Sequence, residues 1–499
     1  MCSVDPDEVV EMSRIADTID LSSGNVLCRK CDTERAVVVL RLKDVYCKMC
    51  FLSYFVHKFR STIGKSKQIR PGDHVLIATS GGPSSMAMLH LVRDGLNETS
   101  HKKLRFQPAF LYIDESCLSH SLENGPDLVQ KICFQVAALK FPCYFISLEK
   151  VMSLKFPIPT LYKDDSKTSS VTTELKEDLK KLLSSCKSET AQQDLLLQLR
   201  QEIYYQCAKA LGYQKIFLGD NATTLSISIL ANVALGRGSQ LADRVHFKTK
   251  YKDVEVFRPL REILLNEITY YNNLNNISTL QIPTLRLKGK SITACTEDFV
   301  MGLQKEFPAT IPTIFRTGDK LISTLSDTSK CSTPDLNGRA NGDTSYHLCA
   351  LCGLNLDTIQ SDSSAVNATL VSQNLSAMDL SGNEKSDVTF HKTDLISTNI
   401  SDNSSNTEKS SVSACCKTNS EACGSEKKSS CCQNDKRDFG DNHRAEVSKE
   451  TVQRYLCYGC RIIVREMSEV GHLPIKVRNC VNEQERHERM REQIKDFLI

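Results

Sequence analysis

Tryptophan is absent from this chain of 499 residues, and aromatic side chains make up only 6% of it. The sequence also lacks any apolar run that approaches the ~20 residues of a membrane helix. The first 20 residues are acidic and have no apolar core, so they do not resemble a secretory signal. We therefore expect a cytoplasmic protein without a membrane partner.

A strong net charge is missing as well. Lys and Arg number 63, Asp and Glu number 60, and the formal net charge is +3. A nearly neutral chain neither requires nor excludes nucleic acid, so any RNA-binding surface has to be a local patch. One basic stretch either meets RNA phosphates or is a solvated flank. It consists of His57, Lys58, Arg60, Lys65, Lys67 and Arg70.

Cysteine, in contrast, is abundant, at 22 residues. In a reducing compartment, paired cysteines are typical of metal ligands rather than of disulfides. Four of them have the spacing of a zinc ribbon, in which two C-x2-C knuckles surround one ion and leave no open position. We expect a structural zinc site here, with iron or unliganded thiols as the alternatives. The four are Cys28, Cys31, Cys47 and Cys50.

Two further C-x2-C pairs lie near the end of the chain, on either side of residues 355–450. This intervening stretch is rich in Ser, Asn, Asp and Thr, a composition typical of disorder. Because each doubling of a flexible loop costs only ~0.6 kcal/mol, the two pairs can form one split zinc site. Its ligands are Cys349, Cys352, Cys457 and Cys460. Isolated cysteines are expected to be buried thiols, namely Cys133, Cys143, Cys207 and Cys295.

Strand and helix signals alternate through residues 71–300, which is typical of an α/β fold with a parallel sheet and helices on both faces. We expect residues 149–175 to be a loop insertion. The expected strands are 74–79, 105–114, 142–148 and 214–220, and the expected helices are 83–95, 123–140, 189–211 and 224–235.

The expected domain plan places a zinc ribbon on each side of this α/β unit. Within the first ribbon we expect a hairpin between the cysteine pairs and a helix after them. The segments are a flexible lead-in (1–25), the N-terminal ribbon (26–60), the α/β domain (61–320), a split ribbon (340–354 plus 451–480) around a disordered insertion (355–450), and a C-terminal helix (481–499).

A glycine-containing turn follows the first expected strand and enters a helix. Its backbone N–H groups and the helix dipole suit a pyrophosphate, and ligands of parallel sheets bind at the carboxyl ends of strands. The serine hydroxyls either add donors to a ligand or cap the helix. The candidate residues are Ser80, Gly81, Gly82, Ser84 and Ser85.

The loop resembles the signature S-G-G-x-D-S of the PP-loop ATP pyrophosphatase family. The turn Gly219–Thr224 resembles the G-H-N-A-D-D motif of that family's tRNA-thiolating branch. Arg258–Leu260 resembles its K/R-P-L segment, and Glu267 is placed like its helix glutamate. The resemblance implies an adenine-nucleotide alpha-hydrolase-like fold, in which Gly219, Asp220 and Asn221 lie at the nucleotide site.

Within that branch, the chain resembles the partner subunits of eukaryotic cytoplasmic wobble-uridine thiolases. The resemblance implies a heterodimer with a catalytic thiolation subunit. It also implies tRNAs for lysine, glutamate and glutamine as substrates of the complex, and a thiocarboxylated ubiquitin-like protein as the sulfur carrier.

Several residues depart from the family pattern. The magnesium-holding Asp of the family is Ser84 here, its two later acidic residues are Thr223 and Thr224, and its His is Asp220. Because a polyphosphate needs a cation, these changes argue against ATP and magnesium binding. The C-x-x-C pair that binds an iron–sulfur cluster or handles sulfur in the branch is missing, and only Cys207 lies in the corresponding helix.

We therefore expect a non-catalytic subunit, with no catalytic residue of its own. One alternative is a self-sufficient ATP-dependent tRNA sulfurtransferase that uses Cys117 or Cys207 to carry sulfur. The other is a zinc-containing protein scaffold that does not bind tRNA, which salt-insensitive partner binding would reveal.

Overall fold

The computed structural model describes residues 26–40, 44–97, 103–118, 125–163, 173–280, 291–321, 348–357 and 448–495. The expected lead-in lies outside these ranges, and so does the expected disordered insertion apart from its two ends. Among the described residues, no helix combines the length and apolar character that a membrane crossing requires.

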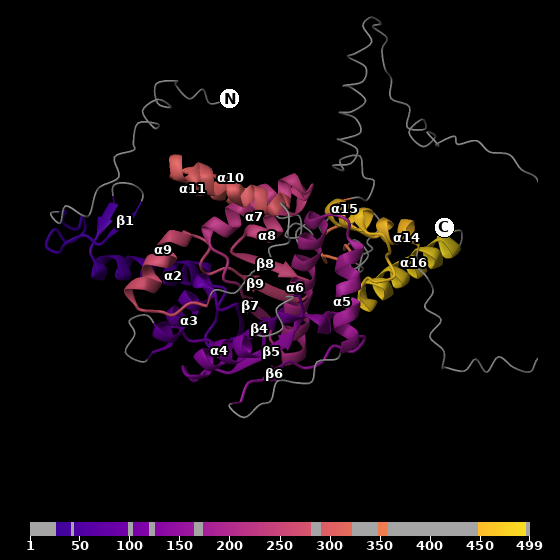
Figure 1. Ribbon diagram of the computed structural model, residues 1–499, viewed down its shortest axis with the longest axis horizontal. Coiled ribbons are helices and arrows are strands. Elements are labelled where there is room, and N and C mark those ends of the chain that lie inside the picture. The colour runs from indigo at the N-terminus through magenta and orange to yellow at the C-terminus, as the bar shows by residue number, and fades with distance from the viewer. Residues whose placement is uncertain are drawn as a thin grey trace, which may run out of the picture. The chain divides into compact units, whose positions relative to one another are not determined.

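A seven-stranded sheet forms the centre of the fold, with the strand order β6-β5-β4-β3-β7-β9-β8 (Figure 1). Five strands run parallel, and the two edge strands, β6 and β8, run antiparallel to their neighbours. The strands are β3 (His74–Thr79), β4 (Gln107–Asp114), β5 (Cys143–Ser147), β6 (Thr160–Leu161), β7 (Lys215–Phe217), β8 (Lys248–Tyr251) and β9 (Val254–Phe257).

The expected α/β fold with a mostly parallel sheet is confirmed, with corrections at the edges. The fourth expected strand is shorter than predicted, since only Lys215–Phe217 pair. Residues 149–175 contain the edge strand β6 as well as loop. The hairpin of β8 and β9 was not expected, and its turn at Lys252 takes a left-handed φ of 55°.

Helices cover both faces of the sheet because the strands alternate their apolar side chains. Along β3, Leu76 lies in one core cluster, while Val75 and Ile77 lie in the other. The Val75 face packs on α2 (Lys48–Ser66), α3 (Pro83–Leu96), α4 (Gly125–Ala137) and α9 (Leu265–Leu274); the Leu76 face packs on α5 (Thr173–Ser185) and α6 (Glu189–Leu211).

A smaller helical layer follows the strand β7. There α7 packs against α10 and α11 through Ala222, Ile227, Val300 and Ile311. These helices are α7 (Ala222–Ala234), α8 (Leu241–Val245), α10 (Ile292–Glu306) and α11 (Thr310–Asp319). Short 3-10 turns occur at Ser116–Leu118, Leu148–Met152 and Gly238–Gln240.

The N-terminal cysteine module joins the sheet through one long helix. The predicted hairpin is confirmed as β1 (Val38–Leu40) and β2 (Asp44–Tyr46), which pair antiparallel. The predicted helix is confirmed as α2, whose fully buried Phe51, Phe55 and Phe59 belong to the same core cluster as Val75. A continuous helix therefore crosses position 60, where we expected the ribbon to end.

The C-terminal cysteine module is part of the core itself. All four of its cysteines lie in the cluster that contains Leu76. The module consists of residues 348–357, α14 (Lys449–Arg454), α15 (Tyr458–Glu466) and α16 (Ile475–Lys495). Two expectations need adjustment, because α14 begins inside the expected insertion and the tail helix starts at Ile475 rather than at 481.

Candidate metal centres and nucleotide loop

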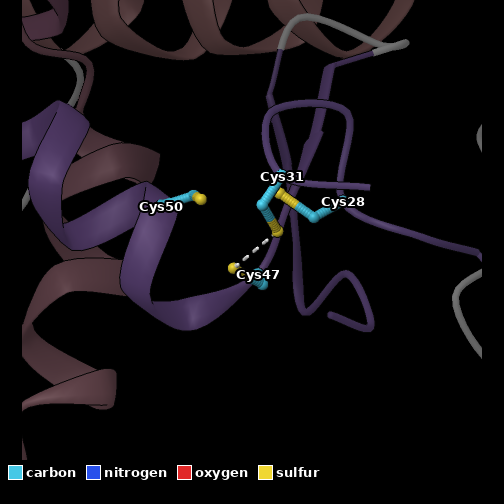
Figure 2. A group of neighbouring side chains, drawn as sticks. All are labelled: Cys28, Cys31, Cys47 and Cys50. Carbon is cyan, nitrogen blue, oxygen red and sulfur yellow. Dashed lines mark hydrogen bonds between the residues drawn. The ribbon is translucent and has the colours of Figure 1, made fainter. Parts of the chain in front are cut away.

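The four N-terminal cysteines converge on one point. Their Sγ atoms all lie within 4.8 Å of one another, and Figure 2 shows them approaching from the loop that precedes β1 and from the start of α2. Cys47 is the residue that precedes α2, and Cys50 lies in its first turn. The Sγ atoms of Cys31 and Cys47 are 3.9 Å apart. Four sulfurs placed in this way suit a tetrahedral ion.

Protonation differs between these thiols. Hydrogen bonds from the side chain and backbone of Thr33 lower the pKa of Cys31 to about 6. Desolvation, together with the neighbouring cysteines, raises the pKa of Cys50 to about 12. Because metal ligation requires thiolates, Cys31 is ready to bind at neutral pH, whereas Cys50 loses its proton when a cation arrives.

The C-terminal cluster unites two distant pairs. The Sγ atoms of Cys352 and Cys457, 105 positions apart, approach to 3.7 Å, and all four sulfurs lie within 4.8 Å of one another. All four cysteines are buried. The first knuckle turns at Gly353, whose φ of 65° favours glycine. The structure thus brings together the two pairs that the sequence analysis joined.

Arg237 lies beside this cluster, and sequence reasoning missed it. Its Nη2 donates to Cys460 Sγ at 3.4 Å, and its Nη1 donates to Asp194 Oδ1 at 2.7 Å. The residue is 0% exposed. Burial alone would lower the pKa of its guanidinium, but Cys460 and Asp194 raise that pKa well above its ordinary value. A fixed positive charge therefore lies next to the sulfurs.

Glycine makes room for this arginine. A Cβ atom at Gly459 would lie 2.5 Å from the Arg237 side chain, closer than real contacts allow. Gly236 has a φ of 70°, and a Cβ atom there would meet Tyr458 at 2.4 Å. The chain thus carries glycine at both points where the guanidinium and the second knuckle approach each other.

The predicted phosphate loop has the expected backbone. It connects β3 to α3, with Gly81 at a φ of 77° and Gly82 as the residue that precedes the helix. Its hydroxyls are turned toward the loop itself. Ser85 Oγ donates to the Gly82 carbonyl at 3.0 Å, and the Oγ atoms of Ser80 and Ser85 are 3.4 Å apart.

The second predicted turn lies directly against this loop. Asn221 Nδ2 donates to Ser84 Oγ at 2.9 Å, and a Cβ atom at Gly219 would lie 3.7 Å from that of Ser84. Asn221 also caps α7 through a reciprocal capping box with Thr224. The structure therefore brings Ser84, Gly219 and Asn221 together, and Ser84 accepts a hydrogen bond at the position where the family has its magnesium-holding carboxylate.

The remaining acidic and hydroxyl candidates serve local structure. Asp220 accepts from Arg258 Nε at 3.0 Å, and burial lowers the pKa of that buried guanidinium. Thr223 Oγ1 accepts from the Leu265 N–H at 3.1 Å. Asp220 is the one carboxylate of the loop and the facing turn, and it already pairs with arginine. The loop and the facing turn therefore offer no unpaired carboxylate to a magnesium ion.

Chain segments also hold the loop from the other side. The Leu280 N–H donates to the Gly81 carbonyl at 3.0 Å, and Asn272 Nδ2 donates to the Pro83 carbonyl at 3.0 Å. These bonds satisfy backbone acceptors with groups of the protein itself.

Lys58 and Cys295 are placed differently from expectation. Lys58, one of the candidates for RNA contact, donates to the buried Glu267 at 3.0 Å, so it braces α2 against α9. Cys295, expected to be buried, is exposed, whereas Cys133, Cys143 and Cys207 are buried as expected. Burial raises the pKa of both Cys117 and Cys207 thiols far above neutrality, which makes them poor nucleophiles.

Comparisons with known proteins agree over nearly the whole chain. A sequence model of the family described as cytoplasmic tRNA 2-thiolation protein 2 matches residues 291–462. The chain is 30% identical to cytoplasmic tRNA 2-thiolation protein 2 of Danio rerio, covering 100% of this chain and 99% of that one. It is 32% identical to cytoplasmic tRNA 2-thiolation protein 2-A of Xenopus laevis, covering 95% and 94%.

Among solved structures, the chain resembles the U34-tRNA thiolase NcsA from Methanococcus maripaludis with its 4Fe-4S cluster. That likeness covers 58% of this chain and 85% of the other, at 16% identity and a TM-score of 0.44. The full-length agreement with the vertebrate proteins, at 30% identity and above, decides the assignment: this chain belongs to the cytoplasmic tRNA 2-thiolation protein 2 family.

Proposed function

We propose that this chain is a non-catalytic subunit of the cytoplasmic complex that 2-thiolates the wobble uridine of tRNAs for lysine, glutamate and glutamine. A role in tRNA 2-thiolation follows from its family. In this proposal, a catalytic paralogue binds ATP and activates the uridine, and a thiocarboxylated ubiquitin-like protein delivers the sulfur. The chain itself forms a heterodimer with the paralogue and contributes to tRNA binding.

One observation carries the non-catalytic part of this proposal. Ser84 stands where the signature of the PP-loop ATP pyrophosphatases has its magnesium-holding carboxylate, and it accepts a hydrogen bond from Asn221 at 2.9 Å. The nearby Asp220 pairs with Arg258. Because a triphosphate in such a loop needs cation ligands, this arrangement supports loss of nucleotide activation with retention of the fold.

We further propose zinc in both cysteine clusters, with a purely structural role. A four-thiolate site has no open coordination position, so it supplies folding energy rather than Lewis-acid chemistry. The Cys28, Cys31, Cys47 and Cys50 site would fix the hairpin on α2, and the Cys349, Cys352, Cys457 and Cys460 site would complete the core of the sheet.

A thiolation assay with ATP and the sulfur carrier tests the proposal. It compares this chain alone, the catalytic paralogue alone, and the two together. We expect full activity only from the pair. Activity from this chain alone at the rate of the pair would show that it activates uridine by itself. Loss of that activity in Cys117→Ser or Cys207→Ser variants would then favour the self-sufficient enzyme.

A further inference from the structure

A basic groove lies along the C-terminal half of α2, at the opposite end of the sheet from the loop. Its volume is about 620 Å³. It is lined from two separate segments, α2 with the turn that follows it and the stretch that leads into β4. Its charged lining residues are Arg60, Lys65, Lys67, Arg70, Lys103 and Arg105, with His57 at one end.

The charge of this groove is one-sided. Six of its lining residues are Lys or Arg, and none is Asp or Glu. Over the whole chain the two signs nearly cancel, at 63 against 60. The nearest carboxylate on the same turn, Asp73, forms an ion pair with Lys215 and accepts the Arg70 N–H at 2.6 Å. The lining of the groove therefore concentrates positive charge, which is the electrostatic footprint of a polyanion site.

The floor of the groove is rigid. Ile63, Leu104 and Phe106 line it and are at most 9% exposed. They belong to the core cluster that holds α2 on the sheet. Lys65, Lys67 and Arg105, in contrast, are exposed at its rim. Long cationic side chains above a buried apolar base can bind an anionic ligand by charge while the fold beneath them stays in place.

A second groove continues this one toward the N-terminal cysteines. It has a volume of about 640 Å³ and shares Ser53 and His57 with the first. Lys30 lines it, next to Cys31, and so do Arg29 and Asp44, which form an ion pair with each other. Its aromatic lining is Tyr46 and Tyr54, whose rings stack with centroids 6.0 Å apart. The 19 residues of α2 span about 28 Å, so the two grooves form an extended face with charged and aromatic groups.

We propose, on the basis of the tRNA role proposed above, that this extended face binds the sugar–phosphate backbone of tRNA. The six cations of the first groove and Lys30 in the second line two adjoining grooves, which matches a chain of spaced phosphates, whereas a phosphopeptide needs one compact cluster.

The position of the groove separates RNA binding from the loop. Arg70 precedes β3 and Arg105 precedes β4, so the groove lies at the amino ends of these strands. The loop lies at their carboxyl ends, and the six residues of β3 span about 20 Å. This chain thus holds the body of the tRNA at a distance from its own inactive loop.

The test measures binding of an unmodified lysine tRNA transcript to the full-length chain over a range of salt concentrations. The variant is Lys65→Glu/Arg105→Glu. Its matched control is Lys180→Glu/Lys305→Glu, which changes the net charge equally at exposed positions outside the groove. At about 150 mM salt, we expect the groove variant to bind about tenfold more weakly or worse, with a salt slope lower by about 2. The control keeps both values.

Further measurements separate the possible failures. Thermal melting checks that both double variants fold. If the groove variant binds tRNA as the wild type does while the reconstituted complex still thiolates, the groove assignment is wrong and the proposed function stands. If the wild-type complex does not thiolate, the proposed function fails. Equal weakening of tRNA binding in both double variants would assign the binding to net charge. Loss of binding to anionic vesicles in the groove variant, with unchanged tRNA binding, would assign the groove to lipid. Either result contradicts the groove assignment.

Discussion

Arg237 carries a buried positive charge to a cluster of four cysteines. Replacing it with methionine removes the Cys460 contact and leaves Asp194 buried without its partner. Since partners of metal ligands typically contribute 10–100-fold in affinity, we expect Arg237→Met to lower zinc affinity at this site by about that factor. Competition with a chromogenic chelator measures the affinity, and absorption of the cobalt-loaded protein reports the geometry.

The matched control for this change is Arg200→Met. Arg200 also lies in an arginine–carboxylate pair, with Glu115 at 2.6 Å, but the cysteine cluster is not among its contacts. An equal loss of zinc affinity in both variants would mean that general destabilisation causes the effect. The double variant Arg237→Met/Asp194→Leu, which leaves no unpaired carboxylate, distinguishes the cysteine contact from the ion pair.

Asn221 connects the phosphate loop to the facing turn, and in our proposal it has no catalytic role. Asn221→Ala removes the cap of α7 and the hydrogen bond to Ser84. We expect a loss of about 1–2 kcal/mol in the free energy of unfolding, which denaturant titration measures. The thiolation rate of the reconstituted complex, per folded heterodimer, should not change. A large fall in that rate at unchanged stability would contradict the non-catalytic role.

Spacing made the cysteines and the loop predictable, because each C-x2-C knuckle and the S-G-G turn is local in sequence. Arg237 was not predictable, since it reaches Cys460 across 223 positions. Lys58 looked like its basic neighbours, and only the packing of α2 on α9 shows that it faces Glu267. Cys295 lies on an exposed side of α10, which its sequence surroundings did not reveal.

At the scale of elements, α3 and α9 meet through the partly buried histidine His90. His90 Nδ1 lies 2.9 Å from the Tyr271 hydroxyl, and Arg93 contacts its other ring nitrogen. Burial lowers the pKa of His90 below its ordinary 6.5, Asp94 opposes this effect, and Arg93 adds to it. The folded protein therefore holds the neutral ring at pH values where the unfolded chain is already protonated.

The sign of the pH effect follows from this difference. Below pH 6.5 the unfolded state binds more protons, so the free energy of unfolding falls as the pH falls toward the folded pKa. Each unit within that window costs at most about 1.4 kcal/mol. We expect His90→Gln to remove this part of the acid sensitivity in denaturant titrations, and His74→Gln, at an exposed site, to leave it. An unchanged pH profile in His90→Gln would contradict the assignment.

Long elements were predictable from their periodicity, and short ones were not. The strands β3 and β4 carry buried apolar runs, and α6 shows helical spacing with a glycine end at Gly212. The edge strand β6 has only two residues, and the β8–β9 hairpin mixes lysines with apolar residues. Their strand character comes from pairing with the sheet, a tertiary effect that local sequence does not encode.

For the whole molecule, we expect the two cysteine clusters to contribute unequally to stability. The C-terminal four belong to the large core cluster with Leu76, whereas the N-terminal four lie at the start of α2 and belong to neither large core cluster. We expect Cys352→Ser to destabilise the entire protein by more than about 4 kcal/mol. Cys31→Ser should loosen mainly the hairpin. Calorimetry with hydrogen exchange distinguishes these outcomes, and metal analysis should find two zinc ions in the wild type and one in Cys31→Ser.

Equal global destabilisation by both cysteine variants would contradict this ranking.

The alternating pattern predicted the α/β architecture, and the composition of the insertion allowed the distant cysteine pairs to be joined. That the joined site completes the core of the sheet was not predictable, because a split ribbon can equally form a separate module.

The separation of Cys352 from Cys457 also delays the completion of this cysteine cluster during synthesis. These positions are 105 residues apart. A ribosome that adds about 5–20 residues per second produces the second pair roughly 5–20 s after the first. Throughout that interval the nascent chain carries Cys349 and Cys352 without their partners, and the sheet face around Leu76 lacks its final cover. On every newly made copy, this surface therefore stays incomplete until the residues around Cys457 and Cys460 leave the ribosome.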